Sequence, residues 1–150
     1  MAGKRRVVVT GMGVVSPVGI GVAEMWKRIV GGRSGVRRIT RFNPHGFATT
    51  FAGEVDGFDP ATTIGRKEAR RMDRYSQFAV ASAREAAEQA GFGSGGFDPE
   101  GIGALIGTGM GAMETLEQGA ETLAAHGPSR LSPFFAPMVL PNMAAGLTAT

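Results

Sequence analysis

The first nineteen residues of the chain constrain its fold most. Strand-forming residues at positions 7–10 (Val-Val-Val-Thr) run directly into a glycine-rich turn that begins Gly11-Met12-Gly13. A short apolar run that ends in such a turn is typical of a buried strand at the point where it leaves an α/β sheet. We therefore expect a strand over about 6–10 and an α/β fold.

The remaining chain alternates segments with helical and strand patterns. Apolar residues at steps of three and four predict helices over 22–30, 66–90 and 112–125. Other patterns predict a short strand over 51–55 within an irregular region, a buried strand over 102–106, an extended proline-containing loop over 128–141, and a last helix capped by Asn142. Strand, helix, strand and helix in this order indicate helices packed on an open α/β sheet.

The composition excludes several classes of protein. The 150 residues contain no cysteine, which excludes a disulfide framework, a thiolate metal site and a cysteine nucleophile within them. No apolar run approaches the roughly 20 residues that span a bilayer, and the apolar stretch near the start is too short for the apolar region of a signal peptide. We therefore expect a cytoplasmic protein without a membrane partner. His45 and His126 stand alone in the sequence, so we interpret both as surface or loop residues.

The charge is modest but patterned. The formal net charge is +3, from 16 basic and 13 acidic residues, and the basic residues gather over 33–41 and 66–74. A calculated pI near 10.0 makes nucleic acid a possible partner. Aromatic residues do not alternate with the basic ones as in surfaces that stack bases, so nucleic-acid binding stays a distant alternative.

Two glycine-rich segments follow the expected strands, and neither fits a nucleotide-binding motif. Gly11-Met12-Gly13 has Ser16 at the third fingerprint position, and no acidic residue stands about 20 residues further on. Gly107-Thr108-Gly109-Met110-Gly111 lacks the Gly-Lys ending of a phosphate loop. Glycines on both sides of Met110 leave its flexible thioether projecting at a strand end, where ligand crevices form in open sheets. A plain core methionine is the alternative.

The chain resembles the amino-terminal part of a β-ketoacyl-acyl carrier protein synthase of the synthase II type. The resemblance rests on residues 5–19, on Arg66-Lys67-Glu68-Ala69-Arg70-Arg71-Met72-Asp73, and on Leu131-Ser132-Pro133-Phe134-Phe135. It implies a thiolase-like layered αβαβα fold, of which residues 1–150 would form an incomplete amino-terminal half. It also implies decarboxylative Claisen condensation in fatty acid elongation, with the cysteine nucleophile and the histidine pair downstream of Thr150. We therefore expect this chain alone to be inactive.

The same resemblance implies roles for individual residues and partners. Met110, Phe134 and Phe135 would border the acyl pocket of a homodimer, and Lys67, Arg70, Arg71 and Arg130 would bind an acidic acyl carrier protein. A solvated basic surface is the alternative interpretation of these charges. No metal or organic cofactor is implied beyond the phosphopantetheine arm of the carrier. Two related functions stay open: the ketosynthase, or the non-catalytic chain-length factor, of a type II polyketide synthase.

Overall fold

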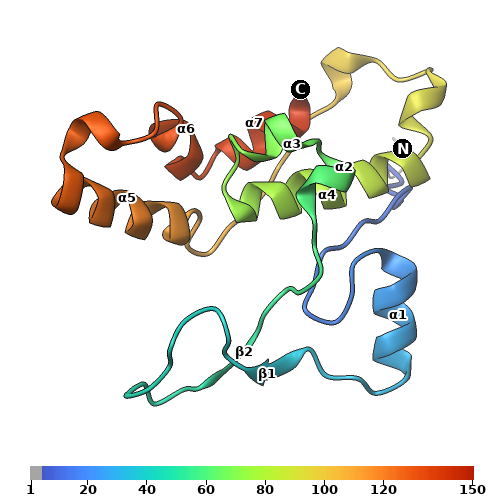
Figure 1. Ribbon diagram of the computed structural model, residues 1–150. Coiled ribbons are helices and arrows are strands. Elements are labelled where there is room, and N and C mark those ends of the chain that lie inside the picture. Colours follow the sequence, from blue (N-terminus) through green and yellow to red (C-terminus); the bar gives the residue numbers. More distant parts are fainter. Residues whose placement is uncertain (1–4) are drawn as a thin grey trace.

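The computed structural model describes residues 5–150, and its central element is helix α4, Arg74–Gln89. Helix α7 (Met143–Ala149) packs along α4, and the short helices α2 (Pro60–Thr63) and α3 (Arg66–Ala69) lie next to them (Figure 1). The buried core is small and consists of Ile64, Ala69, Met72 and Val80, with Leu147 packed against it.

The long helix predicted over 66–90 is wrong, because α3 ends at Ala69 and α4 begins at Arg74. Asp73 causes the break: its backbone is extended, and its carboxylate accepts a hydrogen bond from the backbone N–H of Tyr75 at 3.1 Å. An aspartate in this position begins a new helix because it satisfies one of the free N–H groups of the first turn. Asp73 also accepts a hydrogen bond of 2.5 Å from the Thr115 hydroxyl, which ties the start of α4 to α5.

A separate lobe holds α1 (Val22–Val30) and an antiparallel hairpin of β1 (Val36–Arg38) and β2 (Phe51–Gly53) (Figure 1). In this hairpin Val36 lies opposite Gly53, and Arg38 lies opposite Phe51. The helix over 22–30 and a strand in the region 51–55 are therefore confirmed. Strand β1 lies in a stretch that the sequence left irregular.

The two buried strands predicted over 6–10 and 102–106 are not strands in the part of the chain that the structure describes. A strand exists only through hydrogen bonds to a neighbour, and neither segment has a ladder partner here. Their apolar side chains lie in solvent: Val7 is 94% exposed and Leu105 is 100% exposed. Both segments nevertheless border one hollow of about 1020 Å³ over the alanine-rich face of α4.

The glycine-rich turn after residue 10 packs directly on α4. A Cβ on Gly11 would overlap the carbonyl oxygen of Ala86, and a Cβ on Gly13 would overlap that of Ser82. Two polar side chains of α4 complete this contact: Gln89 accepts from the N–H of Met12 at 2.6 Å, and Glu85 accepts from that of Val14 at 2.9 Å. The second oxygen of Glu85 accepts from the N–H of Val22 at 2.8 Å, at the start of α1.

The chain beyond α4 passes through two single turns, η1 (Phe92–Ser94) and η2 (Pro99–Gly101), and then forms the hairpin of α5 (Met113–His126) and α6 (Phe135–Val139). The turn η3 (Pro128–Arg130) lies between these two helices. The helix predicted over 112–125 is thus confirmed. The extended loop predicted over 128–141 is wrong, because Pro137 lies within the first turn of α6, where a missing N–H costs no hydrogen bond.

Helix α7 begins after Asn142, as predicted, but the Asn142 side chain makes no capping hydrogen bond. The whole chain exposes 11097 Å² of surface, whereas a compact monomer of 15.6 kDa exposes about 7200 Å². The described chain is therefore open, and much of its apolar surface is uncovered.

Candidate functional site

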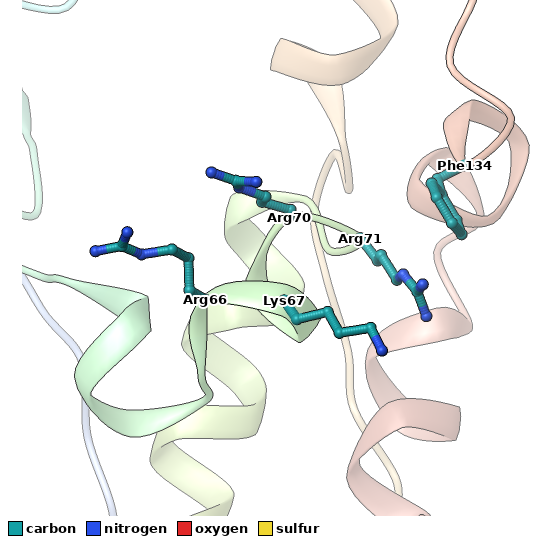
Figure 2. Close-up of a pocket in the computed structure, with 5 residues that line it drawn as sticks. All are labelled: Arg66, Lys67, Arg70, Arg71 and Phe134. Atoms are coloured by element: carbon teal, nitrogen blue, oxygen red, sulfur yellow. The ribbon is translucent and has the colours of Figure 1, made fainter.

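Four basic side chains and one aromatic ring line a hollow of about 370 Å³ at the surface (Figure 2). These residues are Arg66, Lys67, Arg70, Arg71 and Phe134, and we call the hollow the basic hollow. Lys67 and Arg71 extend toward Phe134, whereas Arg66 and Arg70 extend to the other side (Figure 2). The sequence placed all four of these cations in the basic run over 66–74, and three of them, Lys67, Arg70 and Arg71, were expected to bind the carrier.

The short helix α3 and the turn after it present these cations to solvent. Ala69 and Met72 are buried in the core and hold the segment down, and the N–H of Arg71 donates to the carbonyl of Glu68 at 2.9 Å. Arg70 and Arg71 lie between these two anchors and remain exposed. The interruption of the predicted helix is therefore what shapes the site.

The cations of the basic hollow have no acidic partner among the residues that the structure describes. The nearest acidic residue in sequence, Glu68, turns its carboxylate back toward Gly65. Unpaired positive charges gathered around one hollow attract anions, and the attraction weakens as salt screens it.

Arg74 belongs to a different group of charges, although it is part of the basic run over 66–74. Its guanidinium donates to the carbonyl of Val55 at 2.8 Å and lies 4.8 Å from the centre of the Phe78 ring. Burial, together with the nearby positive charge of Arg41, lowers the pKa of Arg74 from its ordinary value. Arg41 itself pairs with Glu114 at 2.5 Å, so this group links the hairpin lobe to α5.

Glu54 is a buried carboxylate that organises the hairpin lobe. It accepts hydrogen bonds from the N–H of Arg41 at 3.0 Å and from the hydroxyl of Thr40 at 2.8 Å, and Arg37 lies 3.8 Å away. The N–H of Arg41 is the largest cause of the lowered pKa of Glu54, followed by the Thr40 groups and Arg37, although burial acts in the opposite direction. These hydrogen bonds and the nearby Arg37 favour the charged form of Glu54, as expected for a carboxylate with a structural role in the hairpin lobe.

Phe134 and Phe135 point to different surroundings. The guanidinium carbon of Arg71 lies 4.8 Å from the centre of the Phe134 ring, which is within the range of a cation–π contact. The Phe135 ring packs against Gly119 of α5, where a Cβ would overlap it. Of the two, only Phe134 lines the basic hollow.

The other residues that the sequence suggested lie elsewhere. Met110 is 74% exposed and lines neither hollow. Arg130 is an exposed residue of η3 and does not line the basic hollow. The structure therefore does not gather Met110, Phe134 and Phe135 into one pocket, and it leaves their acyl-binding role a prediction.

Sequence reasoning missed two groups of contacts. The Arg71–Phe134 contact joins distant segments and has no local signal. The acceptors Glu85 and Gln89 did have a local sequence signal, because an acidic residue and an amide four positions apart share one face of a helix.

Neither histidine side chain forms an ion pair with a residue that the structure describes. Within residues 5–150, no group of three or more histidine, aspartate or glutamate residues could hold a metal ion. No helix in the same range is long and apolar enough to cross a membrane. What the site can do is bind an anionic group beside an aromatic ring.

Comparisons with known proteins identify relatives of this chain. Residues 4–150 match the amino-terminal domain of the β-ketoacyl synthase family. The chain is 44% identical over 146 residues to 3-oxoacyl-[acyl-carrier-protein] synthase 2 of Coxiella burnetii, and the match covers 97% of the chain and 35% of that relative. It therefore spans about a third of the length of such relatives.

Solved structures show the same fold. The ishigamide ketosynthase/chain length factor is similar with a TM-score of 0.79 and 35% identity, over 98% of this chain and 37% of that one. A ketosynthase of a type II polyketide synthase, solved in complex with its acyl-carrier protein, has a TM-score of 0.76 at 20% identity, over 95% of this chain and 38% of that one. The expected thiolase-like fold class is thus confirmed.

Proposed function

Since the chain belongs to the β-ketoacyl synthase family through its match to that family's amino-terminal domain, we propose that it serves a β-ketoacyl-acyl carrier protein synthase of fatty acid elongation. The reaction is decarboxylative Claisen condensation. An acyl group passes from its carrier thioester to a cysteine thiolate, and the thiol of that carrier leaves. A malonyl thioester then loses CO2, and the resulting carbanion attacks the acyl thioester and releases the cysteine thiolate. These 150 residues contain no cysteine, so we expect no 3-oxoacyl product from this chain alone.

The proposed contribution of this chain is to bind the carrier protein at the basic hollow. The observation that supports it most is the group of four cations that have no acidic partner within residues 5–150, in a chain 44% identical to a synthase named for its acyl-carrier-protein substrate. An acidic partner would be steered toward this surface and oriented on it. Arg130 is a further contact proposed from the family resemblance. The phosphopantetheine arm would come with the carrier, and no other cofactor is proposed.

A binding measurement with an acyl carrier protein tests this proposal. Each exposed ion pair contributes about 0.2 to 1 kcal/mol, and charge reversal turns an attraction into a repulsion of similar size. We therefore expect the triple variant Lys67→Glu, Arg70→Glu and Arg71→Glu to bind about tenfold more weakly or worse. Added salt should weaken the wild-type complex much more than that of the variant.

A matched control separates a local site from a general effect of charge. The triple variant Lys27→Glu, Arg33→Glu and Arg38→Glu changes the net charge by the same amount, at exposed residues without ion pairs in the described chain. It should bind the carrier within about threefold of the wild type. Equal losses in both variants would show that net charge, and not the basic hollow, governs binding.

The polyketide alternative is favoured by one observation, the likeness to a ketosynthase/chain length factor at 35% identity. The two functions differ in whether the whole protein catalyses condensation without a separate ketosynthase subunit. Condensation of acyl and malonyl carrier thioesters by that protein alone supports an elongating synthase. A requirement for a separate ketosynthase subunit supports a chain-length factor. Homodimer formation and cytoplasmic location are proposed with the elongating synthase.

A further inference from the structure

Phe134 forms the aromatic wall of the basic hollow, and its contact with Arg71 has a consequence for anion binding. Arg71 is exposed, and its guanidinium carbon lies 4.8 Å from the centre of the Phe134 ring. Among the described residues its guanidinium makes no ion pair. Arg74 makes a similar contact with Phe78, but Arg74 also donates to the Val55 carbonyl. Arg71 therefore keeps its N–H donors for a ligand, whereas Arg74 has committed one of its five to the Val55 carbonyl.

The backbone at Phe134 is held in place on both sides. The hydroxyl of Ser132 accepts a hydrogen bond from the N–H of Phe134 at 3.1 Å, which fixes the turn before α6. The next residue, Phe135, packs on Gly119 and anchors the start of α6 to α5. The ring of Phe134 thus reaches the hollow from a segment whose backbone is fixed.

We infer that Phe134 is a positioning residue of this surface, which holds the Arg71 guanidinium ready for bidentate contact with a carboxylate of the partner. An aromatic ring attracts a guanidinium at its face, and the N–H groups at the edge of the guanidinium plane stay free. A free arginine side chain must lose rotational freedom when it binds, and a ring that already restricts it reduces that loss. This inference deepens the proposed carrier-binding function and rests on the same surface.

The test compares side chains at position 134 that differ in aromatic character. Hexaglutamate is the probe, because it offers carboxylates without any carrier fold. We expect Phe134→Leu, which keeps an apolar side chain, to bind hexaglutamate about two- to fivefold more weakly than the wild type. Phe134→Trp, which offers the strongest aromatic face, should bind as tightly as the wild type or more tightly.

Two further readouts separate positioning from a merely structural role. In an Arg71→Gln background, Phe134→Leu should have no effect on binding, because the guanidinium is already absent. The NMR signal of the Arg71 Nε–H group should show a ring-current shift in the wild type and in Phe134→Trp, and should lose it in Phe134→Leu. The salt dependence of binding should be unchanged in Phe134→Leu, since no charge is removed.

Several outcomes would overturn the inference: equal binding of hexaglutamate by the wild type and Phe134→Leu, a loss in Phe134→Trp as large as in Phe134→Leu, or no binding to the wild type. The carrier protein is measured in parallel. If hexaglutamate follows the expected order while no carrier protein binds, the proposed function fails and the role of Phe134 stands.

Discussion

Two glycines in helices of this chain provide a matched pair that measures the packing of the α5–α6 hairpin. Gly119 in α5 is buried, and a Cβ added there would overlap the Phe135 ring. Gly146 in α7 is exposed, and a Cβ added there would meet nothing within 4 Å. Glycine to alanine gains about 1 kcal/mol of helix propensity at either site.

We expect opposite effects on the free energy of unfolding. Gly146→Ala should stabilise the chain by about 1 kcal/mol, the propensity gain alone. Gly119→Ala forces the Phe135 ring to move, and overpacking of this kind costs about 1 to 3 kcal/mol, which leaves a net loss of about 0 to 2 kcal/mol. The two variants should therefore differ by about 1 to 3 kcal/mol, or roughly 2 to 12 °C in Tm for a chain of this size.

Urea denaturation of both variants beside the wild type gives these free energies. A third variant, Gly119→Ala with Phe135→Leu, should recover part of the loss, because the smaller side chain leaves room for the new methyl group. If Gly119→Ala stabilises the chain as much as Gly146→Ala, Phe135 is not packed on α5. The fixed backbone that we assign to Phe134 would then lose its support.

Three further predictions concern single side chains. Asp73→Ala should destabilise the chain by about 1 to 3 kcal/mol in urea denaturation, since it removes the cap of α4 and the acceptor for Thr115; Thr115→Val should cost less, because the cap remains. Glu54 has a pKa below its ordinary value of 4.5, so its contribution to stability is present above pH 4.5 and is lost as the pH falls through the lowered pKa. The variant Glu54→Gln should therefore flatten the acid side of a plot of stability against pH. An unchanged plot would contradict this prediction. Met110→Ala should change the free energy of unfolding by less than about 0.5 kcal/mol, as expected for an exposed residue, while it shifts acyl-chain preference in the whole protein; a loss of about 2 kcal/mol or more would show a core methionine.

Local patterns predicted the elements whose causes are local. Helix α1 follows from its apolar spacing and from the glycines after Val30, and α5 ends near the Gly127-Pro128 pair that the sequence indicated. The break before α4 also had a local cause, but the capping role of Asp73 was hidden among residues with good helical spacing. The segments over 6–10 and 102–106 could not be settled locally, because a strand depends on a partner elsewhere in the chain.

The candidate site also combines features that local sequence indicated with features that depend on distant residues. The positions of Lys67, Arg70 and Arg71 in one group followed from their spacing, but the separate contacts of Arg74 depend on the carbonyl of Val55 and the ring of Phe78. The separation of Phe134 from Phe135 depends on Gly119, which no pattern near those two residues reveals. The family resemblance predicted roles for these residues, whereas their contacts could be found only in the structure.

The bond between Val14 and Glu85 also bears on how the chain acquires its structure on the ribosome. The two residues are 71 positions apart, so at about 5 to 20 residues per second the carboxylate emerges about 4 to 14 s after the N–H group that it binds. During this delay the glycine-rich turn over 11–14 has no helix α4 to pack on. The turn that holds Val14 therefore becomes ordered only after α4 has emerged, and the valines at 7–9, which stay exposed beside it, would be a target for chaperones.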